Sequence, residues 1–310
     1  MPSLRVQALA KVNLGLRVLH RRPDQFHELR TVFQTISLAD RMEIHYRPGR
    51  GRSIVLTCDR PELAGSHNLA ARAANRLLQA SGKGGQVRIH IEKRIPVAAG
   101  LGGGSSDAAA VLRALGSLLG PPPGPETLLR LAAELGSDVP FFLLGGRALG
   151  LGRGTDVYPM ADPPTEWLVV AAPPIEVSTA EAYRRLSPHL TRRRRQAKIY
   201  GFCSRICADE PGPGGVVAVD WENDFEQVVF RMYPELEKLK ARLETLGARP
   251  ALLCGSGSAL FGRFGDRRQA LRARDSLDLE DGRSFVVNTV TRAGYRARWV
   301  RWLRIGRTTA

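Results

Sequence analysis

Cysteine and long apolar runs are both scarce in this 310-residue sequence. It has four cysteines, and none belongs to a CxxC pair or to a Cys/His cluster with zinc spacing, so we expect reduced thiols and no zinc fold. No stretch approaches the roughly 18 apolar residues of a membrane-spanning helix. The N-terminal sequence Met-Pro-Ser-Leu-Arg runs directly into strand-like sequence without a signal-peptide pattern. These observations predict a cytoplasmic protein without a membrane partner.

Acidic residues are also few relative to basic ones. The sequence has 46 Lys+Arg against 30 Asp+Glu, a net charge of +16, which favours polyanionic partners: nucleic acid, anionic lipid or phosphorylated small molecules. Arginines gather in the run 192–195 and in the last 21 residues, where six occur without an acid. We interpret both as solvated surface. The alternatives are attraction of anionic substrates, an oligomer contact and nucleic-acid binding.

The share of apolar residues, 43%, is typical of a globular protein. Strand patterns come first, helices follow, and mixed pairs end the chain, which predicts an α+β fold rather than a regular βαβ alternation. Glycine and proline gather near 150–170, so we expect two lobes, 1–160 and 161–310. Ser178 and Glu181 form a capping box at a helix start. The predicted elements are helices over 66–80, 107–119 and 125–135, a helix from Pro234 to Gly247, and strands over 87–92, 251–253, 260–264 and 284–289.

The strongest chemical signal is the glycine-rich stretch 96–109, which lies between a strand and a helix. Four of the five residues from 100 to 104 are glycine, so the backbone is free to adopt positive φ and a ligand can approach closely. Ser105, Ser106 or Asp107 could cap the following helix. Free amides and the positive end of that helix would bind an anion. The stretch is neither a Walker A loop nor a dinucleotide fingerprint, and we predict that it binds a phosphate chain.

Three further sequence features are weak alone and become informative together with this loop. Lys11 and Asn13 are two residues apart in a strand pattern and therefore share a face. Asp138 precedes an apolar Val-Pro-Phe-Phe run, so it is either a partly desolvated functional carboxylate or a helix N-cap with Pro140 in the first turn. The glycine- and serine-rich segment 254–258 joins two strands as a turn and lacks the spacing of a hydrolase elbow.

Taken together, the sequence resembles the GHMP small-molecule kinases over about residues 5–290. Within this family, one branch acts on a cytidine diphosphate substrate and is distinguished from the mevalonate and homoserine kinases by the segment that stands here at 26–34. That segment reads Phe-His-Glu-Leu-Arg-Thr-Val-Phe-Gln. The segments that carry the resemblance are 10–14, 26–34, 96–109, 136–142, 177–181, 223–226 and 255–258.

The resemblance implies a two-lobed α+β fold, with a ribosomal-S5-like N-terminal lobe, a ferredoxin-like C-terminal lobe and the active site between them. It implies transfer of the ATP γ-phosphoryl group to the 2-hydroxyl of a methylerythritol unit in non-mevalonate isoprenoid precursor biosynthesis. Mg²⁺ would assist, with an oxygen of Ser105 or Ser106 as one possible ligand and the full ligand set open. We expect a monomer or homodimer. A GHMP kinase for another alcohol is the main alternative, and a nucleic-acid-binding protein is the less favoured one.

Residue roles also follow from the resemblance. Lys11 and Asp138 would be the catalytic pair. Phe26 stands where the family usually has tyrosine, which keeps stacking on cytosine but loses a phenolic hydrogen bond. The ATP phosphate loop would comprise Pro96, Val97, Ala98, Ala99, Gly100, Leu101, Gly102, Gly103, Gly104, Ser105 and Ser106. The substrate contacts would be Asn13, Phe26, His27, Thr179 and Tyr183.

Overall fold

Two long antiparallel strands begin the chain, β1 (Ser3–Arg21) and β2 (His27–Pro48). Nearly all their apolar residues are buried. Their register shifts twice near the middle of β1, between Leu9 and Lys11 and between Asn13 and Gly15. Such irregularities bend a strand and re-aim its side chains. Lys11 and Asn13 therefore lie on the short regular piece between two bends.

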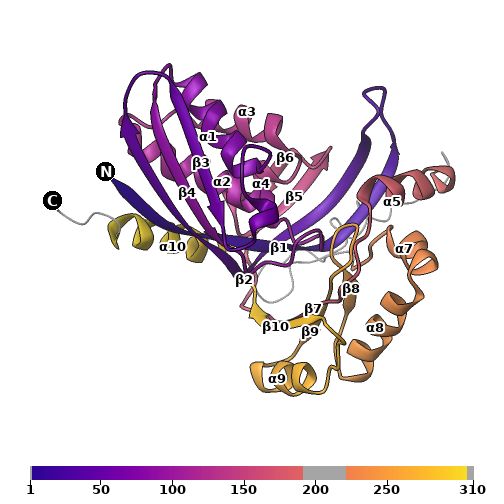
Figure 1. The fold of residues 1–310 in the computed structure, drawn as a ribbon. Coiled ribbons are helices and arrows are strands. Elements are labelled where there is room, and N and C mark those ends of the chain that lie inside the picture. Colours follow the sequence, from indigo (N-terminus) through magenta and orange to yellow (C-terminus); the bar gives the residue numbers. More distant parts are fainter. Residues whose placement is uncertain (1, 191–220, 306–310) are drawn as a thin grey trace.

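The computed structural model describes residues 2–190 and 221–305, which form two lobes (Figure 1). In the N-terminal lobe, β2 pairs with β1 along one edge and with β4 and β5 along the other, and only the β3–β4 pair is parallel. Helices cover one face of this sheet (Figure 1). The remaining strands are β3 (Arg52–Cys58), β4 (Gly85–Glu92), β5 (Arg147–Gly152) and β6 (Asp156–Pro159), and the helices are η1 (Pro61–Leu63), α1 (Leu69–Ala80), α2 (Gly103–Leu118), α3 (Pro125–Leu135) and α4 (Val139–Leu144).

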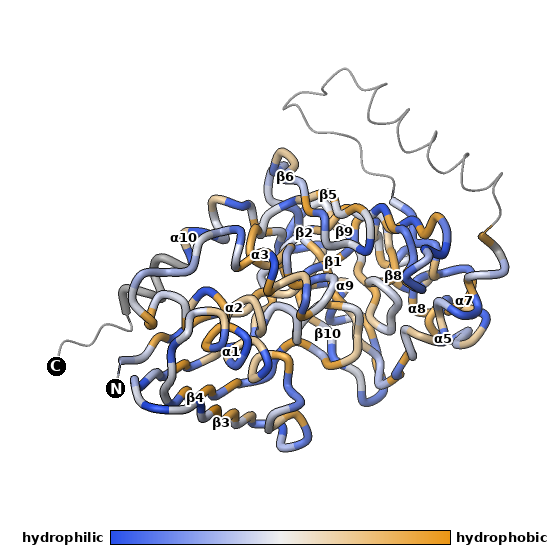
Figure 2. Tube along the Cα trace, turned by 90° about the horizontal axis from the view of Figure 1, so that it is seen from above, coloured by the Kyte–Doolittle hydropathy of each residue, from blue (hydrophilic) through white to orange (hydrophobic). Residues whose placement is uncertain are grey.

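The C-terminal lobe is a four-stranded antiparallel sheet in the order β10-β7-β9-β8, with helices packed against it. Figure 2 shows hydrophobic and hydrophilic residues alternating along β3 and β4 of the first lobe, as expected for strands buried on one face. The elements of the second lobe are β7 (Trp167–Ala172), α5 (Thr179–Leu186), η2 (Ser187–His189), α7 (Glu226–Met232), α8 (Pro234–Thr245), β8 (Ala251–Leu253), β9 (Leu260–Phe264), α9 (Arg267–Asp275) and β10 (Arg283–Asn288), and α10 (Arg292–Ile305) follows.

A cluster of buried apolar residues joins the two lobes. It combines Leu14 and Val32 of the first sheet with Leu168, Val170 and Phe261 of the second, and all five are buried. Burial of apolar surface stabilises this contact by about 25 cal/mol per Å² removed from water. The middle of β1, which carries Leu14 of this cluster, therefore lies between the two lobes and is held there by contacts with both.

The helix predicted over 107–119 begins four residues earlier, at Gly103. Its N-cap is Gly102, with φ of +71° and no side-chain capping bond, so the expectation that Ser105, Ser106 or Asp107 caps this helix was wrong. The positive φ suits glycine, and it turns the chain into the helix without a side-chain acceptor. Of the capping box expected at α5, the N-cap bond is confirmed, because the Ser178 hydroxyl accepts from the amide of Glu181, whereas the Glu181 carboxylate contacts Arg184 and Arg185.

The expected α+β fold with two lobes is confirmed, while the division between residues 160 and 161 stays a prediction. The arginine run 192–195 lies outside the described residues. No helix in the described part of the chain is long and apolar enough to cross a membrane.

Candidate active site

A cavity of about 1160 Å³ opens between the lobes and gathers nearly all the residues singled out in the sequence. The catalytic candidates Lys11 and Asp138, the five substrate candidates and residues 96–105 all line it. Ser106 does not, because its hydroxyl points away and donates to the carbonyl of Leu9 at 2.7 Å. The structure therefore brings together segments that are far apart in the sequence.

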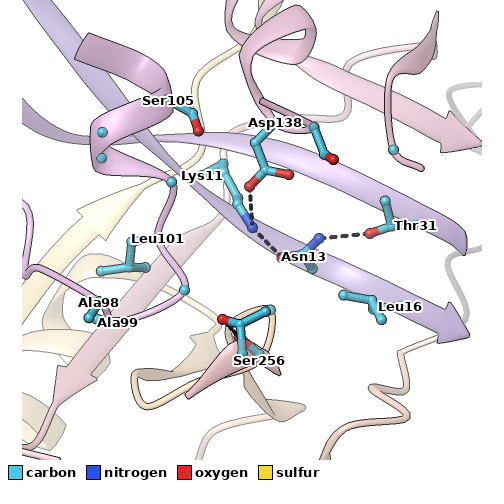
Figure 3. Close-up of a pocket in the computed structure, with 18 of the residues that line it drawn as sticks. Lys11, Asn13, Leu16, Thr31, Ala98, Ala99, Leu101, Ser105, Asp138 and Ser256 are labelled. Carbon is cyan, nitrogen blue, oxygen red and sulfur yellow. Dashed lines mark hydrogen bonds and ion pairs between the residues drawn. The ribbon is translucent and has the colours of Figure 1, made fainter. Parts of the chain in front are cut away.

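Lys11 stands at the centre of a chain of polar contacts (Figure 3). Its side chain is 4% exposed, and Nζ lies 3.3 Å from Oδ2 of Asp138 and donates to Oδ1 of Asn13 at 2.7 Å. Asn13 Nδ2 donates in turn to Thr31 Oγ1 at 2.7 Å, and that hydroxyl donates to the carbonyl of Gly15. Each side chain in this series has a hydrogen-bond partner, so the ammonium group is held in one place.

Asp138 occupies the N-cap position of α4, but its carboxylate makes no capping hydrogen bond there. The side chain is instead turned toward Lys11 and is 30% exposed. Of the two interpretations left open by the sequence, the geometry favours the carboxylate that faces the cavity. An oxygen of Asp138 is thus available to a bound molecule while the other contacts the ammonium group.

The glycine loop approaches distant parts of the chain closely at two points, once against backbone and once against side chains. Gly100, with φ of +77°, lies against the carbonyl of Cys254 so tightly that an added Cβ would overlap it. A Cβ on Gly102 would lie 2.9 Å from Phe142 Cζ and 3.1 Å from Lys11 Cγ. The first intrahelical bond of α2 runs from the Ser106 amide to the Gly102 carbonyl, so the amides that precede it remain available to an anion.

The opposite end of the cavity is aromatic. The rings of His27 and Tyr183 stack with centroids 4.6 Å apart, and His27 Nε2 is 3.0 Å from the hydroxyl of Ser187. Burial, aided by the charge of Arg21, lowers the pKa of His27. Burial raises the pKa of Tyr183, and the charge of Asp138 adds to that effect. A neutral imidazole with one donor and one acceptor nitrogen fits a base edge better than an anion.

Sequence reasoning missed Arg153, which follows β5 and lines the same aromatic end. Its Cζ lies 3.6 Å from the centroid of Phe26, and Phe26 is itself 46% exposed. An arginine over an aromatic face is attracted to the ring quadrupole. A single arginine in a glycine-rich turn carries no local signal, so only the fold could reveal this contact.

A turn of the second lobe closes the site from below (Figure 3). The Ser256 hydroxyl is 2.8 Å from that of Thr179, and Asn223 Nδ2 donates to the carbonyls of Leu253 and Gly255. Asn223 belongs to the segment 223–226, for which the sequence indicated no role. These two hydrogen bonds show that it holds the turn against the cavity.

A buried charge cluster, not recognised from the sequence, lies behind the phosphate loop. Lys93 Nζ contacts Asp40 Oδ2 at 2.5 Å and Asp107 Oδ2 at 2.8 Å, while Asp40 Oδ1 accepts from the amides of Arg94 and Ile95. Asp107 Oδ1 is buried without a hydrogen-bond partner. Burial raises the pKa of Asp107 to about 7, although Lys93 opposes the shift and Asp40 adds to it.

The pH dependence of stability follows from that shift. The folded state holds the Asp107 proton more tightly than the unfolded state, so this stabilisation is complete below the unfolded pKa near 3.8 and is lost as the pH rises through about 7. We expect the melting temperature of the wild type, relative to that of Asp107→Asn, to fall between about pH 4 and 7. Thermal denaturation across this range checks it, and a constant difference between the two proteins would contradict the assignment.

Oxygen ligands for a divalent cation are sparse in the cavity. No cluster of three or more His, Cys, Asp or Glu side chains suited to a metal occurs in residues 2–190 and 221–305. Ser105 lines the cavity near Asp138, and Figure 3 shows both side chains on the same side of Lys11. One hydroxyl and one carboxylate suit Mg²⁺, which keeps several waters and takes further oxygens from phosphates.

Comparisons with known proteins agree on one family. The model for the GHMP kinases N terminal domain matches residues 68–146, and that for the GHMP kinases C terminal matches residues 215–282. A 4-diphosphocytidyl-2-C-methyl-D-erythritol kinase of Solibacter usitatus is 48% identical over 300 residues, 96% of this chain and 92% of that protein. A crystal structure of 4-(cytidine 5'-diphospho)-2C-methyl-D-erythritol kinase is 38% identical, with a TM-score of 0.73 over 92% of this chain and 99% of the other. The homoserine kinase of Cytophaga hutchinsonii, 19% identical with a TM-score of 0.69 over 94% and 95% of the two chains, shares the fold.

Proposed function

Because the chain belongs to the 4-diphosphocytidyl-2-C-methyl-D-erythritol kinases, a branch of the GHMP kinase family, we propose that it phosphorylates the 2-hydroxyl of that diphosphocytidyl alcohol. It is an ATP-dependent kinase of isoprenoid precursor biosynthesis. The observation that carries the substrate proposal is one cavity with a glycine loop and the Lys11–Asp138 pair at one end and the His27–Tyr183 stack at the other.

In the proposed reaction the loop amides and the N-terminal end of α2 hold the ATP phosphates. Asp138 accepts a hydrogen bond from the acceptor hydroxyl and takes its proton as the new oxygen–phosphorus bond forms. The bond between the γ-phosphorus and the β-bridging oxygen breaks, and ADP leaves. Lys11, fixed by Asn13, stabilises the negative charge around the transferred group.

Mg²⁺ is also part of the proposal. Ser105 would hold the ion together with phosphate oxygens and water, and the ion would neutralise charge on the β- and γ-phosphates. Ser106 is not proposed as a ligand, because its hydroxyl already donates to the Leu9 carbonyl.

His27, Tyr183 and Phe26 are proposed to hold the cytosine. His27 offers to the base edge the ring nitrogen that does not face Ser187, and the exposed face of Phe26 provides a surface on which a base can stack. Arg153 lies against Phe26 and Arg21 lines the same end, so a diphosphate would meet positive charge there. Thr179, beside Ser256, would border the same part of the substrate.

Loss of the His27 side chain should weaken binding of the diphosphocytidyl substrate but not of ATP. We expect His27→Ala to weaken binding of the diphosphocytidyl substrate by about 1–3 kcal/mol, roughly 5- to 150-fold in Kd, because a hydrogen-bonding site is lost. ATP affinity should change little. His45→Ala is the control, since His45 lies on the same strand β2 but does not line the cavity. Isothermal titration measures both ligands, and equal losses for ATP and the alcohol would contradict the assignment.

Substrate class is tested by ADP release with three acceptors. We expect release to depend on the diphosphocytidyl alcohol and to stay near background with homoserine or mevalonate, which carry no base for the aromatic end. Preference for one of the two small alcohols would instead establish a GHMP kinase with another acceptor.

A further inference from the structure

The end of the described chain returns from the C-terminal lobe to the N-terminal one. After β10, the amide of Val290 donates to the carbonyl of Thr35 at 2.8 Å, and the amide of Arg292 donates to Asp162 Oδ2 at 2.6 Å. The helix α10 then lies beside β1, away from the sheet of the second lobe (Figure 1). The last helix therefore belongs spatially to the lobe that carries the glycine loop and Asp138.

Among residues 292–298, the part of α10 whose side chains the structure describes, Tyr295 is the most deeply buried. It is 1% exposed, and its hydroxyl donates to the carbonyl of Phe142 at 2.6 Å. Its ring fills the space above Gly145, where an added Cβ would overlap it. Phe142 and Gly145 form the end of α4, so the tyrosine both covers that end and occupies a carbonyl that has no intrahelical donor.

The helix held in this way is short and carries the candidate catalytic base. α4 has six residues, with Asp138 at its N-cap and Phe142 one turn later. The ring of Phe142 faces Gly102, and Phe141 stacks on Phe33 at 4.8 Å between centroids. A helix of fewer than two turns has little stability of its own, so its orientation is set by such contacts.

We propose that Tyr295 is a positioning residue, whose hydroxyl bond to the Phe142 carbonyl fixes the tilt of α4 and thereby the placement of Asp138 beside Lys11. The inference rests on the proposed function, because it assigns Tyr295 an effect only through the Lys11–Asp138 pair. In this proposal the hydrogen bond from Tyr295 to the Phe142 carbonyl keeps Lys11 Nζ and Asp138 Oδ2 at their distance of 3.3 Å.

Tyr295→Phe tests the proposal, because it keeps the ring and removes only the hydroxyl. We expect kcat to fall roughly tenfold, since small displacements of a catalytic group are costly. The KM of the alcohol and the Kd of ATP should stay within about threefold, because neither the base pocket nor the loop amides depend on this bond.

Tyr46→Phe is the matched control. Tyr46 is also a buried tyrosine of the N-terminal lobe, and its hydroxyl donates to the carbonyl of Gly84 at 2.8 Å, but it does not line the cavity or touch α4. Both variants lose one hydrogen bond to a backbone carbonyl, and Tyr295→Phe also removes the hydroxyl from beside the buried Arg113, so its loss in melting temperature should be at least as large as that of Tyr46→Phe. Only Tyr295→Phe should lose kcat. Equal kcat losses in both variants would overturn the proposal.

A double-mutant cycle with Asp138→Asn tests the route of the effect. If Tyr295 acts by placing Asp138, the tyrosine substitution should cost less than about twofold in single-turnover rate once Asp138 is replaced. A full tenfold loss in that background, or wild-type kcat in Tyr295→Phe, would overturn the inference. A failure of the proposed function is distinguishable, because the wild type would then release no ADP in response to the diphosphocytidyl alcohol.

Discussion

Asp138→Asn is expected to lower kcat by about 10²–10⁴-fold, the usual contribution of a positioned general base. The amide cannot take the proton of the acceptor hydroxyl, although it has nearly the same size. The melting temperature should stay near that of the wild type, because Asn is as good an N-cap as Asp and the Asp138 side chain makes no capping bond. ATP affinity should also be retained, since the loop amides bind the phosphates.

Lys11→Ala completes this test. It should cause a comparable loss, and the double variant should lose less than the product of the two single losses, because the pair acts as a unit. Steady-state rates and melting curves of the three variants measure it. An Asp138→Asn enzyme that keeps more than about a tenth of the wild-type kcat would contradict the catalytic assignment.

The second large effect is expected from Gly102→Ala. Gly102 has φ of +71°, which costs an alanine about 1–2 kcal/mol, and the new methyl group would meet Phe142 and Lys11. If the loop relaxes away from this conformation, the amides of α2 no longer point at the phosphates. We therefore expect the Kd of ATP to rise roughly 5- to 30-fold, the equivalent of that strain.

Gly82→Ala is the control for strain alone. Gly82 has φ of +63° after α1, and an added Cβ would meet no atom within 4 Å. This variant should lose stability by a similar amount without a change in ATP affinity, because Gly82 lies outside the cavity lining. Calorimetric titration of ATP separates the two, and equal ATP affinity in both variants would remove Gly102 from the phosphate loop.

Local sequence predicted those parts of the molecule that depend on local physics. The helix over 125–135 and the strands over 251–253 and 260–264 have the predicted bounds, because Pro125 and the turn at 254–258 mark their ends clearly. The glycine-rich stretch was also predicted correctly as a loop before a helix, because glycines leave the backbone free to adopt positive φ, while its binding of phosphate stays a prediction. Lys11 and Asn13 could be placed on one face from strand periodicity alone.

The parts that were missed depend on contacts between distant segments. α2 begins within the glycine run because the left-handed backbone of Gly102 caps it, whereas side-chain rules favour serine or aspartate. Arg153 meets Phe26 only because β5 lies beside β2. The return of α10 to the first lobe is equally invisible, since the tail reads as a basic surface until Tyr295 is found buried against α4.

The measurement that most directly tests the central claim is identification of the product made from ATP and the diphosphocytidyl methylerythritol. The account predicts one ADP per product molecule, a mass gain of one phosphoryl group, and a new phosphorus resonance coupled to carbon 2 of the methylerythritol unit. Lys11→Ala and Asp138→Asn should form this product far more slowly. A phosphoryl group on another hydroxyl, or ADP release that is the same without the alcohol, would contradict the account.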